Sequence, residues 1–367
     1  MHRSAVTKAR AKVPWTIFQD LLGDAVNVAY ECWPNAPKYL WQGMSVFAID
    51  GSKYNLPASA ELRAAFDPHS GLEYSGKGHY PQCLVSTLYD VFRRLPIARY
   101  VGPRDSSERD AALKLLPFMP PNNLCIFDRG FPSYDFIRKF QENYSGYFLM
   151  RCSAKSTFPA VERFANSNKK EDVICLKPTH NSLQKVEKED RINLRPLKIR
   201  VIRLTSPDGN VSVLLTNLLD RKIFPYHEFI TLYARRWEVE TYYRDEKIVL
   251  DVDKFHGATL NSINQELFAA AIMSVISRTM MVLSSVPMEA GVIEPQFKNA
   301  IMTLASEAAV LAPDDPETAV LIFEEILQAI LRVKYYRPKR PRPPAIRVTK
   351  RALNKWATAK LKKVANA

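Results

Sequence analysis

Apolar runs bounded by turn residues dominate the first third of the chain. The runs "SVFAID", "QCLVSTLYDVF" and "NLCIFDRG" end near Asp, Gly or Arg. Runs of this length are typical of strands buried on both faces, although periodicity alone also allows short helices. Between them, "SSERDAALKLL" predicts a helix capped by Ser106 or Ser107, and "PSYDFIRKFQEN" predicts another that begins around Pro132 and Ser133. Strands that alternate with helices indicate an α/β core.

The pattern changes between residues 153 and 217. "SNKKED" and "KVEKED" are charged and turn-like, and "LKIRVIRL" and "VSVLLTNL" flank the turn "TSPDGN". This predicts a β-hairpin around Pro207, Asp208 and Gly209. A long polar helix, a second helix over about 261–283, an Ala/Glu-rich helical region and a basic tail follow. We therefore expect a short N-terminal helical segment (1–42), a first core part (43–152), a β-rich insertion (153–217), a second core part (218–290) and a helical basic C-terminal region (291–367).

Net charge is concentrated at the C-terminus. The chain carries +14, and residues 331–367 contain thirteen Lys or Arg and no Asp or Glu, so residues 1–330 carry only +1 (14 − 13). Such a tail neutralises phosphates on nucleic acid or on an anionic membrane surface, or it is simply a solvated end. Its aromatic residues, Tyr335, Tyr336 and Trp356, favour ordered contact with DNA.

Composition is that of a soluble globular protein. Apolar residues make up 47% of the chain and charged residues 25%. The five cysteines are scattered without metal-binding spacing, which fits core positions in a reducing compartment. The basic N-terminus makes a poor signal peptide, and "LFAAAIMSVI" is too short before Ser277 and Arg278 to span a membrane. We expect a cytoplasmic, nucleoid-associated protein without a membrane partner.

Two aspartates share one sequence context. Asp50 and Asp128 each follow four mainly apolar residues and each precede a glycine within two positions. On parallel strands, both carboxylates would lie at the carboxyl edge of the sheet, where α/β proteins place their sites. The alternative is that each aspartate only begins a turn, and the sequence pattern leaves both interpretations open.

The stretch "LYARRWEVETYYRDEK" separates into faces when it is drawn as a helix. At about 100° per residue, one stripe is formed by Tyr233, Arg236, Glu240 and Lys247. Glu240 lies between apolar flanks and needs a partner, which is either Arg236 or Lys247 in an ion pair, or a metal ion. The opposite face is expected to be solvated, and its acidic residues are Glu238, Asp245 and Glu246.

Two aspartates from strands and a glutamate from a later helix match the layout of a ribonuclease H-like nucleotidyl-transfer site. We therefore expect a ribonuclease H-like mixed sheet flanked by helices. Three carboxylates supply the hard oxygen ligands that Mg²⁺ prefers. A pair of ions can activate the attacking oxygen and stabilise the leaving oxygen of a phosphodiester.

Four motifs resemble those of one family. The spacing Y-x2-R-x3-E-x6-K, made by Tyr233, Arg236, Glu240 and Lys247, is similar to the Y-R-E-K signature of bacterial insertion-sequence DDE transposases. "AIDGS", "DRGF" and "LLTNL" resemble the accompanying motifs, so the resemblance covers about residues 45–260. It implies that two Mg²⁺ ions, replaceable by Mn²⁺, are bound by Asp50, Asp128 and Glu240, and that transposon-end DNA is contacted by Tyr233, Arg236 and Lys247.

The resemblance also implies cut-and-paste transposition. Its expected steps are strand cleavage, hairpin formation, hairpin opening and joining to target DNA by a homodimer that holds two ends. Asp50 is preceded by only 49 residues, whereas the family usually carries about a hundred residues of end-binding domain before this motif. The alternative hypotheses are therefore a truncated, non-transposing DNA-binding inhibitor or relic, and, less favoured, a ribonuclease H-like repair nuclease.

Overall fold

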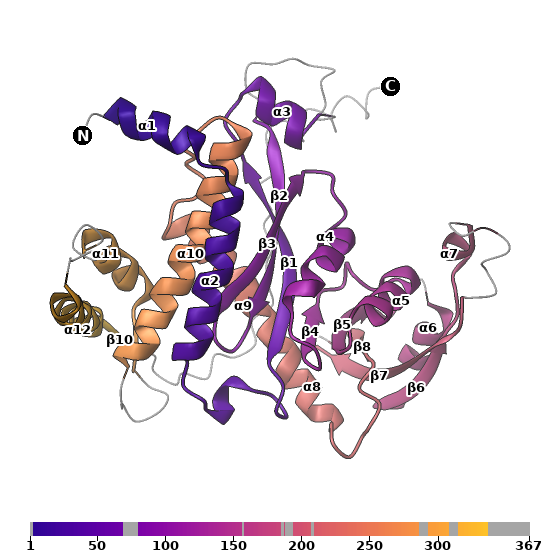
Figure 1. The fold of residues 1–367 in the computed structure, drawn as a ribbon. Helices are drawn as coiled ribbons and strands as arrows, with labels where there is room; N and C mark the ends of the chain where they lie inside the picture. The colour runs from indigo at the N-terminus through magenta and orange to yellow at the C-terminus, as the bar shows by residue number, and fades with distance from the viewer. Residues whose placement is uncertain are drawn as a thin grey trace.

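An eight-stranded mixed sheet forms the centre of the computed structural model (Figure 1). The structure describes residues 3–68, 80–155, 158–184, 187, 194–206, 209–285, 293–307 and 315–336. Along the sheet the strand order is β3-β2-β1-β4-β5-β8-β7-β6. The strands are β1 (Val46–Asn55), β2 (Gln82–Asp90), β3 (Leu95–Pro103), β4 (Leu124–Phe127), β5 (Tyr147–Ser153), β6 (Glu171–Leu176), β7 (Leu197–Thr205) and β8 (Val211–Thr216).

Pairing along the sheet is mixed. Strands β1, β2 and β3 are antiparallel neighbours, whereas β1, β4 and β5 run parallel to one another. This arrangement of β1 to β5 confirms the expected ribonuclease H-like fold. The parallel pairs are short and almost fully buried, which explains why their sequences are continuous apolar runs.

Helices cover both faces of the sheet. Alternate residues of β1 point to opposite sides, since Phe47 and Ile49 pack in one apolar cluster and Val46 and Ala48 in the other. The first cluster is covered by α2 (Thr16–Cys32), α4 (Glu108–Leu115), α5 (Tyr134–Asn143) and α6 (Pro159–Ala165). The second is covered by α3 (Ala60–Phe66), α8 (Tyr226–Tyr233) and α9 (Trp237–Ile248). The result is a three-layer α/β/α core.

Two helix caps follow the sequence prediction. Ser107 caps α4 by accepting from the Asp110 N–H, and Ser133 caps α5 by accepting from the Phe136 N–H. The hairpin is confirmed as well, because β7 and β8 pair in antiparallel fashion and Gly209 adopts a left-handed φ of 80° at the turn. Pro207 and Asp208 lie outside the described residues. Strands β6 to β8, in the segment expected to be an insertion, extend the central sheet itself.

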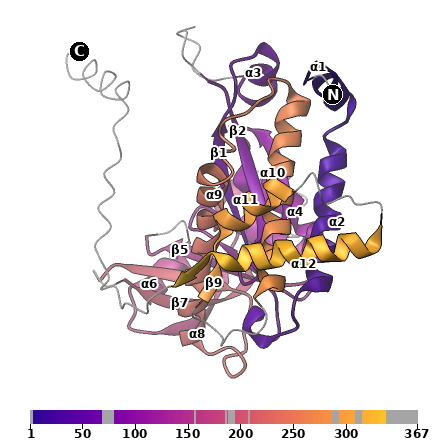
Figure 2. The ribbon, with the colours of Figure 1, turned by 90° about the vertical axis from the view of Figure 1, so that its left-hand side faces the viewer.

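The helix α10 (Leu260–Ser284) matches the helix predicted over 261–283 and packs along α2 and the edge strand β3 (Figure 1). It is long and apolar enough to cross a membrane by length and composition, and 56% of its most apolar window is buried inside the protein. Its last turns meet α11 (Phe297–Glu307) and α12 (Pro316–Arg332), which lies across α10 and α11 in Figure 2. Strands β9 (Ile293–Pro295) and β10 (Lys334–Tyr336) pair beside them. The remainder of the basic tail, residues 337–367, lies outside the described residues.

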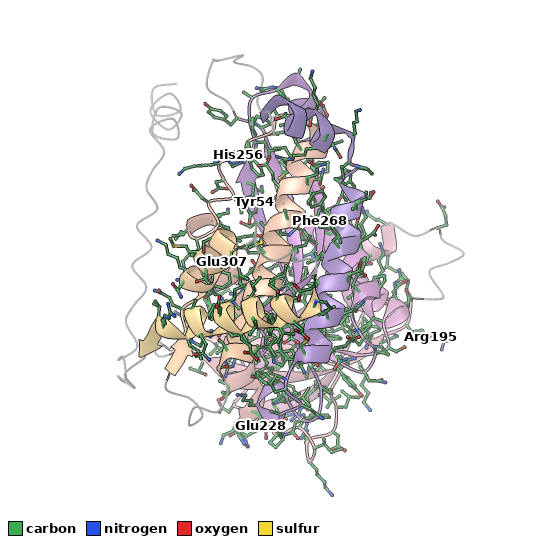
Figure 3. All side chains as sticks on the ribbon, turned by 60° about the vertical axis from the view of Figure 1, so that its left-hand side comes forward. Tyr54, Arg195, Glu228, His256, Phe268 and Glu307 are labelled. Atoms are coloured by element: carbon green, nitrogen blue, oxygen red, sulfur yellow. The ribbon has the colours of Figure 1, made fainter. Side chains whose placement is uncertain are left out.

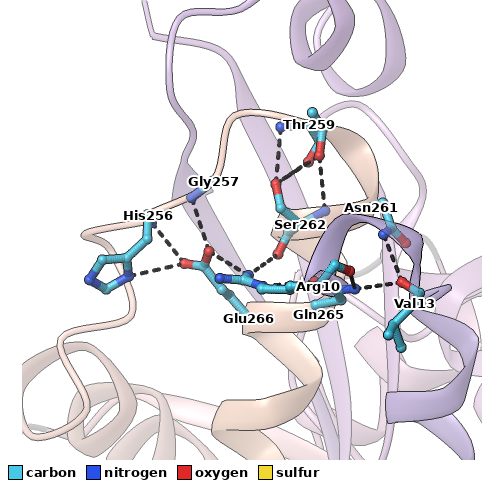
Figure 4. Close-up of polar contacts among 9 residues, drawn as sticks. All are labelled: Arg10, Val13, His256, Gly257, Thr259, Asn261, Ser262, Gln265 and Glu266. Carbon is cyan, nitrogen blue, oxygen red and sulfur yellow. Dashed lines mark hydrogen bonds and ion pairs between the residues drawn. The ribbon is translucent and has the colours of Figure 1, made fainter. Parts of the chain in front are cut away.

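The N-terminal helix α1 (Arg3–Lys12) is attached to the start of α10 through Glu266 (Figure 4). Glu266 Oε1 lies 2.8 Å from Nη2 of Arg10 and also accepts from the Gly257 N–H, while Oε2 accepts from the His256 N–H. One carboxylate therefore joins α1, α10 and the segment that leaves α9. Shorter helical elements are η1 (Pro37–Tyr39), η2 (Leu116–Phe118) and α7 (His180–Gln184).

Candidate active site

Asp50 and Asp128 meet where β4 ends beside β1. The parallel register pairs Val46 with Leu124 and Ala48 with Ile126, so two further residues along each chain place Asp50 level with Asp128. The sequence placed both carboxylates at the carboxyl ends of their strands, and this prediction is wrong for Asp50. It lies inside β1, which continues to Asn55 because β2 remains paired with it along that whole length.

The turn after β4 is held by local hydrogen bonds. Asp128 Oδ1 accepts from the Gly130 N–H at 2.7 Å. Arg109 of α4 donates from Nη2 to the Gly130 carbonyl at 2.7 Å and from Nε to the Phe131 carbonyl at 3.0 Å. The turn that carries Asp128 is thus fixed both by its own glycine and by a cation from a neighbouring helix.

The stretch expected to form one long helix is interrupted. After α8, the residues Ala234–Arg236 form a 3-10 turn, η4, and α9 begins at Trp237. The prediction of a continuous α-helix is wrong here, because a 3-10 turn changes the angle between successive residues. Tyr233 and Arg236 are buried, and the side chain of Glu240 is 37% exposed.

Arg236 lies between two of the predicted metal ligands. Its Nη2 atom is 2.6 Å from Glu240 Oε1, and its Nη1 atom is 3.4 Å from Asp50 Oδ2. The guanidinium carbon stands 4.9 Å from the centre of the Trp237 ring. The ion-pair partner that the sequence left open for Glu240 is therefore Arg236, and the same cation reaches the strand that carries Asp50.

Several of the predicted residues affect one another's pKa. Burial raises the pKa of Asp50 to about 7, the Gly51 N–H and Arg236 lower it, and the nearby charges of Asp128 and Glu240 raise it. Burial, opposed by Arg236 and Arg151, raises the pKa of Tyr233 to about 12, and Asp128 adds to this shift. The raised pKa of Asp50 therefore reflects mainly its burial, which disfavours the charged form of the carboxyl group.

Lys247 lies further along β1 than the other predicted residues. Its Nζ atom donates to the Lys53 carbonyl at 2.8 Å and stands 4.3 Å from the centre of the Tyr54 ring. Lys53 is three residues beyond Asp50, a separation of about 10 Å in an extended strand. The structure thus groups five of the six predicted side chains and places Lys247 at one side of the group.

Glu246 differs most from its prediction. The sequence predicted that Glu246 lies on the solvated face of the helix with Glu238 and Asp245. In the structure Glu246 is 1% exposed and forms an ion pair with Arg99 of β3. Glu238 and Asp245 also have arginine partners, Arg94 and Arg278 respectively. The helix packs on the sheet by a wider face than its apolar residues indicated.

Two further residues near the site were missed by sequence reasoning. Tyr243 directs its hydroxyl to the Asp50 carbonyl at 2.8 Å and to the Val85 carbonyl at 3.0 Å. Glu108 lies against Gly51, where an added Cβ would be 3.1 Å from its Oε1 atom. Burial raises the pKa of Glu108, and the charge of Asp128 adds to this effect. The only sequence signal for Glu108 is its place just after the cap of α4.

The chemistry of the three carboxylates fits a divalent cation. They are oxygen donors from β1, the turn after β4, and α9, and Mg²⁺ favours such ligands. Among the described residues, no three Asp, Glu, His or Cys side chains are already close enough to hold one ion. Arg236 contacts Asp50 and Glu240 instead. A bound ion would take over the neutralisation that the guanidinium supplies.

The central mixed sheet and the carboxylates at the junction of β1 and β4 define an α/β protein with an acidic site at the middle of its sheet. The family model described as "Transposase DDE domain" matches residues 41–276. The chain belongs to this family.

Two curated relatives come from Escherichia coli (strain K12). The transposase InsG of insertion sequence element IS4 is 26% identical over 283 residues, which are 74% of this chain and 58% of InsG. The putative transposase InsZ is 29% identical over 143 residues, 37% of this chain and 44% of InsZ. The matches thus span about half the length of these relatives. A solved structure, the piggyBac transposase synaptic complex with hairpin DNA, aligns with a TM-score of 0.42 at 10% identity, covering 82% of this chain and 59% of that one.

Proposed function

We propose that this protein is a transposase that cleaves DNA at the ends of an insertion sequence and joins those ends to target DNA, with Mg²⁺ as its cofactor and Mn²⁺ as a substitute. Its DNA partners would be the element ends and the target, bound by a homodimer. The observation that carries the proposal is the placement of the three carboxylates in a chain that belongs to the Transposase DDE domain family. Asp50 lies level with Asp128 in the register of β1 and β4, and Arg236 contacts both Asp50 and Glu240.

Asp50, Asp128 and Glu240 would hold the divalent ions. When bound, the ions would supply activation of the attacking oxygen and stabilisation of the leaving oxygen at phosphorus. Gly51 and Gly130 orient the two aspartates through their backbone N–H groups. These contacts leave further carboxylate oxygens as donors, since each carboxylate accepts several bonds.

The cationic side chains would bind the DNA backbone. Arg236 presents a planar guanidinium, which suits two-point recognition of a phosphate. Its position between Asp50 and Glu240 would place its donors next to the scissile bond. Lys247 would contact a phosphate further along the DNA strand, because its Nζ atom binds the carbonyl of Lys53, which is about 10 Å beyond Asp50 on β1. Tyr233, whose pKa is raised to about 12 mainly by burial, keeps its hydroxyl proton and can donate to a phosphate oxygen.

The direct experiment uses DNA that carries the inverted repeats flanking the gene. The purified 367-residue chain should cut a duplex with this end in Mg²⁺ and should leave it intact in EDTA. Joining of the cut end to a target plasmid should follow. Cutting without joining would favour a nuclease, and binding without cutting would favour a DNA-binding protein that does not transpose.

A further inference from the structure

A buried ion pair lies beneath the helix that carries Glu240. The side chains of Glu246 and Arg99 both have zero exposure, and Glu246 Oε1 lies 2.5 Å from Arg99 Nη2. Burying two charges is unfavourable unless both are paired and fully hydrogen-bonded. Both carboxylate oxygens of Glu246 have hydrogen-bond partners, whereas the Nε atom of Arg99 has none among the described residues.

The pair and the groups that surround it come from four elements, β1, β3, α9 and α10. Glu246 Oε2 accepts from the Tyr54 hydroxyl of β1 at 2.5 Å, and Oε1 accepts from the Tyr242 hydroxyl of α9 at 2.8 Å. Arg99 of β3 donates from Nη1 to the Leu267 carbonyl of α10 at 2.5 Å. Tyr54 lies in the interior of the molecule (Figure 3). Burial is the largest cause that raises the pKa of both tyrosines, which keeps their hydroxyls as donors.

The same network touches the strand that carries Asp50. Tyr54 is four residues beyond Asp50 on β1, and the next residue after Glu246, Lys247, donates to the Lys53 carbonyl. Tyr243 donates to the Asp50 carbonyl itself. Helix α9 is thus joined to β1 by polar contacts at Asp50 and at Lys53 and Tyr54 beyond it.

Such contacts fix the helix more narrowly than apolar packing does. A shift of one residue turns a helix by about 100° and moves it about 1.5 Å along its axis. Apolar side chains repack to follow a changed geometry, whereas a displaced buried carboxylate loses its partners. Only one setting of α9 satisfies Glu246, and in that setting Glu240 reaches the guanidinium that also contacts Asp50.

We propose that Glu246 is a positioning residue that, through Arg99 and Tyr54, sets helix α9 so that Glu240 meets the two aspartates around the metal ions. This inference rests on the proposed function. It assigns to Glu246 no contact with DNA or with the ions.

The test compares Glu246→Gln with Glu238→Gln on the same helix. Glu238 makes its ion pair with Arg94 at a partly exposed position, where side-chain exposure is 20% and 27%. Binding of Mn²⁺ is measured by electron paramagnetic resonance without DNA, and Mg²⁺-dependent cleavage is measured on the flanking-repeat duplex. Loss of a residue that orients metal ligands typically costs about 10- to 100-fold in metal affinity or activity. We expect such a loss for Glu246→Gln, with affinity for the duplex in Ca²⁺ within about twofold, and changes below about twofold for Glu238→Gln.

A double variant separates positioning from folding. Arg99→Met with Glu246→Met replaces the pair by apolar side chains of similar length, a change that often keeps or raises stability. We expect this folded variant to bind Mn²⁺ as weakly as Glu246→Gln. Wild-type Mn²⁺ affinity in the double variant, or in a folded Glu246→Gln, would overturn the inference. If the wild type binds Mn²⁺ and Glu246→Gln binds it more weakly, but neither protein cleaves DNA, the inference holds and the proposed function fails. Failure of the wild type to bind Mn²⁺ would overturn both.

Discussion

The guanidinium of Arg236 lies 2.6 Å from the carboxylate of Glu240. Because the same guanidinium is 3.4 Å from Asp50, one cation links the helix and the strand that carry two of the proposed metal ligands. Without a metal ion, this contact partly neutralises a cluster of acidic groups. The stability and the activity of the protein should therefore both depend on how the charge of this cluster is balanced.

The first prediction concerns the pH dependence of stability. Burial raises the pKa of Asp50 to about 7, above about 3.9 in the unfolded chain. A carboxyl group whose pKa is raised on folding makes its full contribution to the free energy of unfolding below about pH 4. This contribution is lost as the pH rises through about 7. Asp50→Asn cannot ionise, so its free energy of unfolding should exceed that of the wild type by about 2 to 4 kcal/mol at pH 8 without metal.

Urea unfolding of both proteins at pH 4 and pH 8, in EDTA, measures this difference. The advantage of Asp50→Asn should be small at pH 4 and near its full size at pH 8. Asp105→Asn changes an exposed aspartate and serves as the matched control. An equal advantage of Asp50→Asn at the two pH values would show that Asp50 is ionised without penalty.

Divalent ions should counteract the same penalty. A ligand that binds only the folded state stabilises it by about 2.7 kcal/mol at a concentration one hundred times its dissociation constant. Mg²⁺ should therefore raise the melting temperature of the wild type at pH 8 and should have little effect on Asp50→Asn combined with Asp128→Asn. Differential scanning calorimetry at increasing Mg²⁺ measures both. Equal increases in the melting temperature of the two proteins would show that the stabilising Mg²⁺ ion is not bound by Asp50 and Asp128.

A second buried arginine should contribute strongly to stability. Arg200 of β7 has no exposed side-chain surface, pairs with Glu171 at 2.5 Å and donates to the Phe224 carbonyl ahead of α8. Arg200→Met leaves these acceptors without a donor, so unfolding should become easier by about 3 to 5 kcal/mol. Arg221→Met is the control, since Arg221 is 48% exposed and 3.9 Å from the same glutamate. Chemical denaturation of both variants measures the two effects, and a loss below about 1 kcal/mol for Arg200→Met would contradict the prediction.

The attachment of α1 should depend on Glu266. Arg10 and two backbone N–H groups donate to the carboxylate of Glu266, as Figure 4 shows. Glu266→Gln removes the negative charge of this acceptor. Helix α1 should then separate from α10 more often, and trypsin should cut after Lys8, Arg10 or Lys12 several times faster. Limited proteolysis followed by mass spectrometry reports the sites. Glu31→Gln, an exposed change on α2, should leave the cutting rate as in the wild type.

The sequence predicted most of the strands and several helix ends because their signals are local. The apolar runs before Asp50 and Asp128 require burial on both faces, and Ser107 and Ser133 can satisfy the first N–H groups of a helix by themselves. These features depend on residues a few positions apart. They therefore form in the same way regardless of the long-range contacts of the chain.

The role of Glu246 could not be predicted in the same way. Its partners Arg99 and Tyr54 are 147 and 192 residues away in the chain, and no local pattern connects them. The sequence prediction also treated residues 232–247 as one regular α-helix, whereas the 3-10 turn at Ala234–Arg236 interrupts it. Charged residues are usually exposed, so a buried and fully paired glutamate is the exception that helical periodicity misses.

The central claim is that Asp50, Asp128 and Glu240 act together in metal-dependent DNA cleavage. The most direct measurement is single-turnover cleavage of the flanking-repeat duplex in Mg²⁺ by the wild type, Asp50→Asn, Asp128→Asn, Glu240→Gln and the control Glu238→Gln. Each of the first three variants should lose at least about 100-fold in rate, since each change removes a negative charge that the reaction needs. The control should remain within about twofold of the wild type. Wild-type cleavage by any one of the three variants would contradict the account.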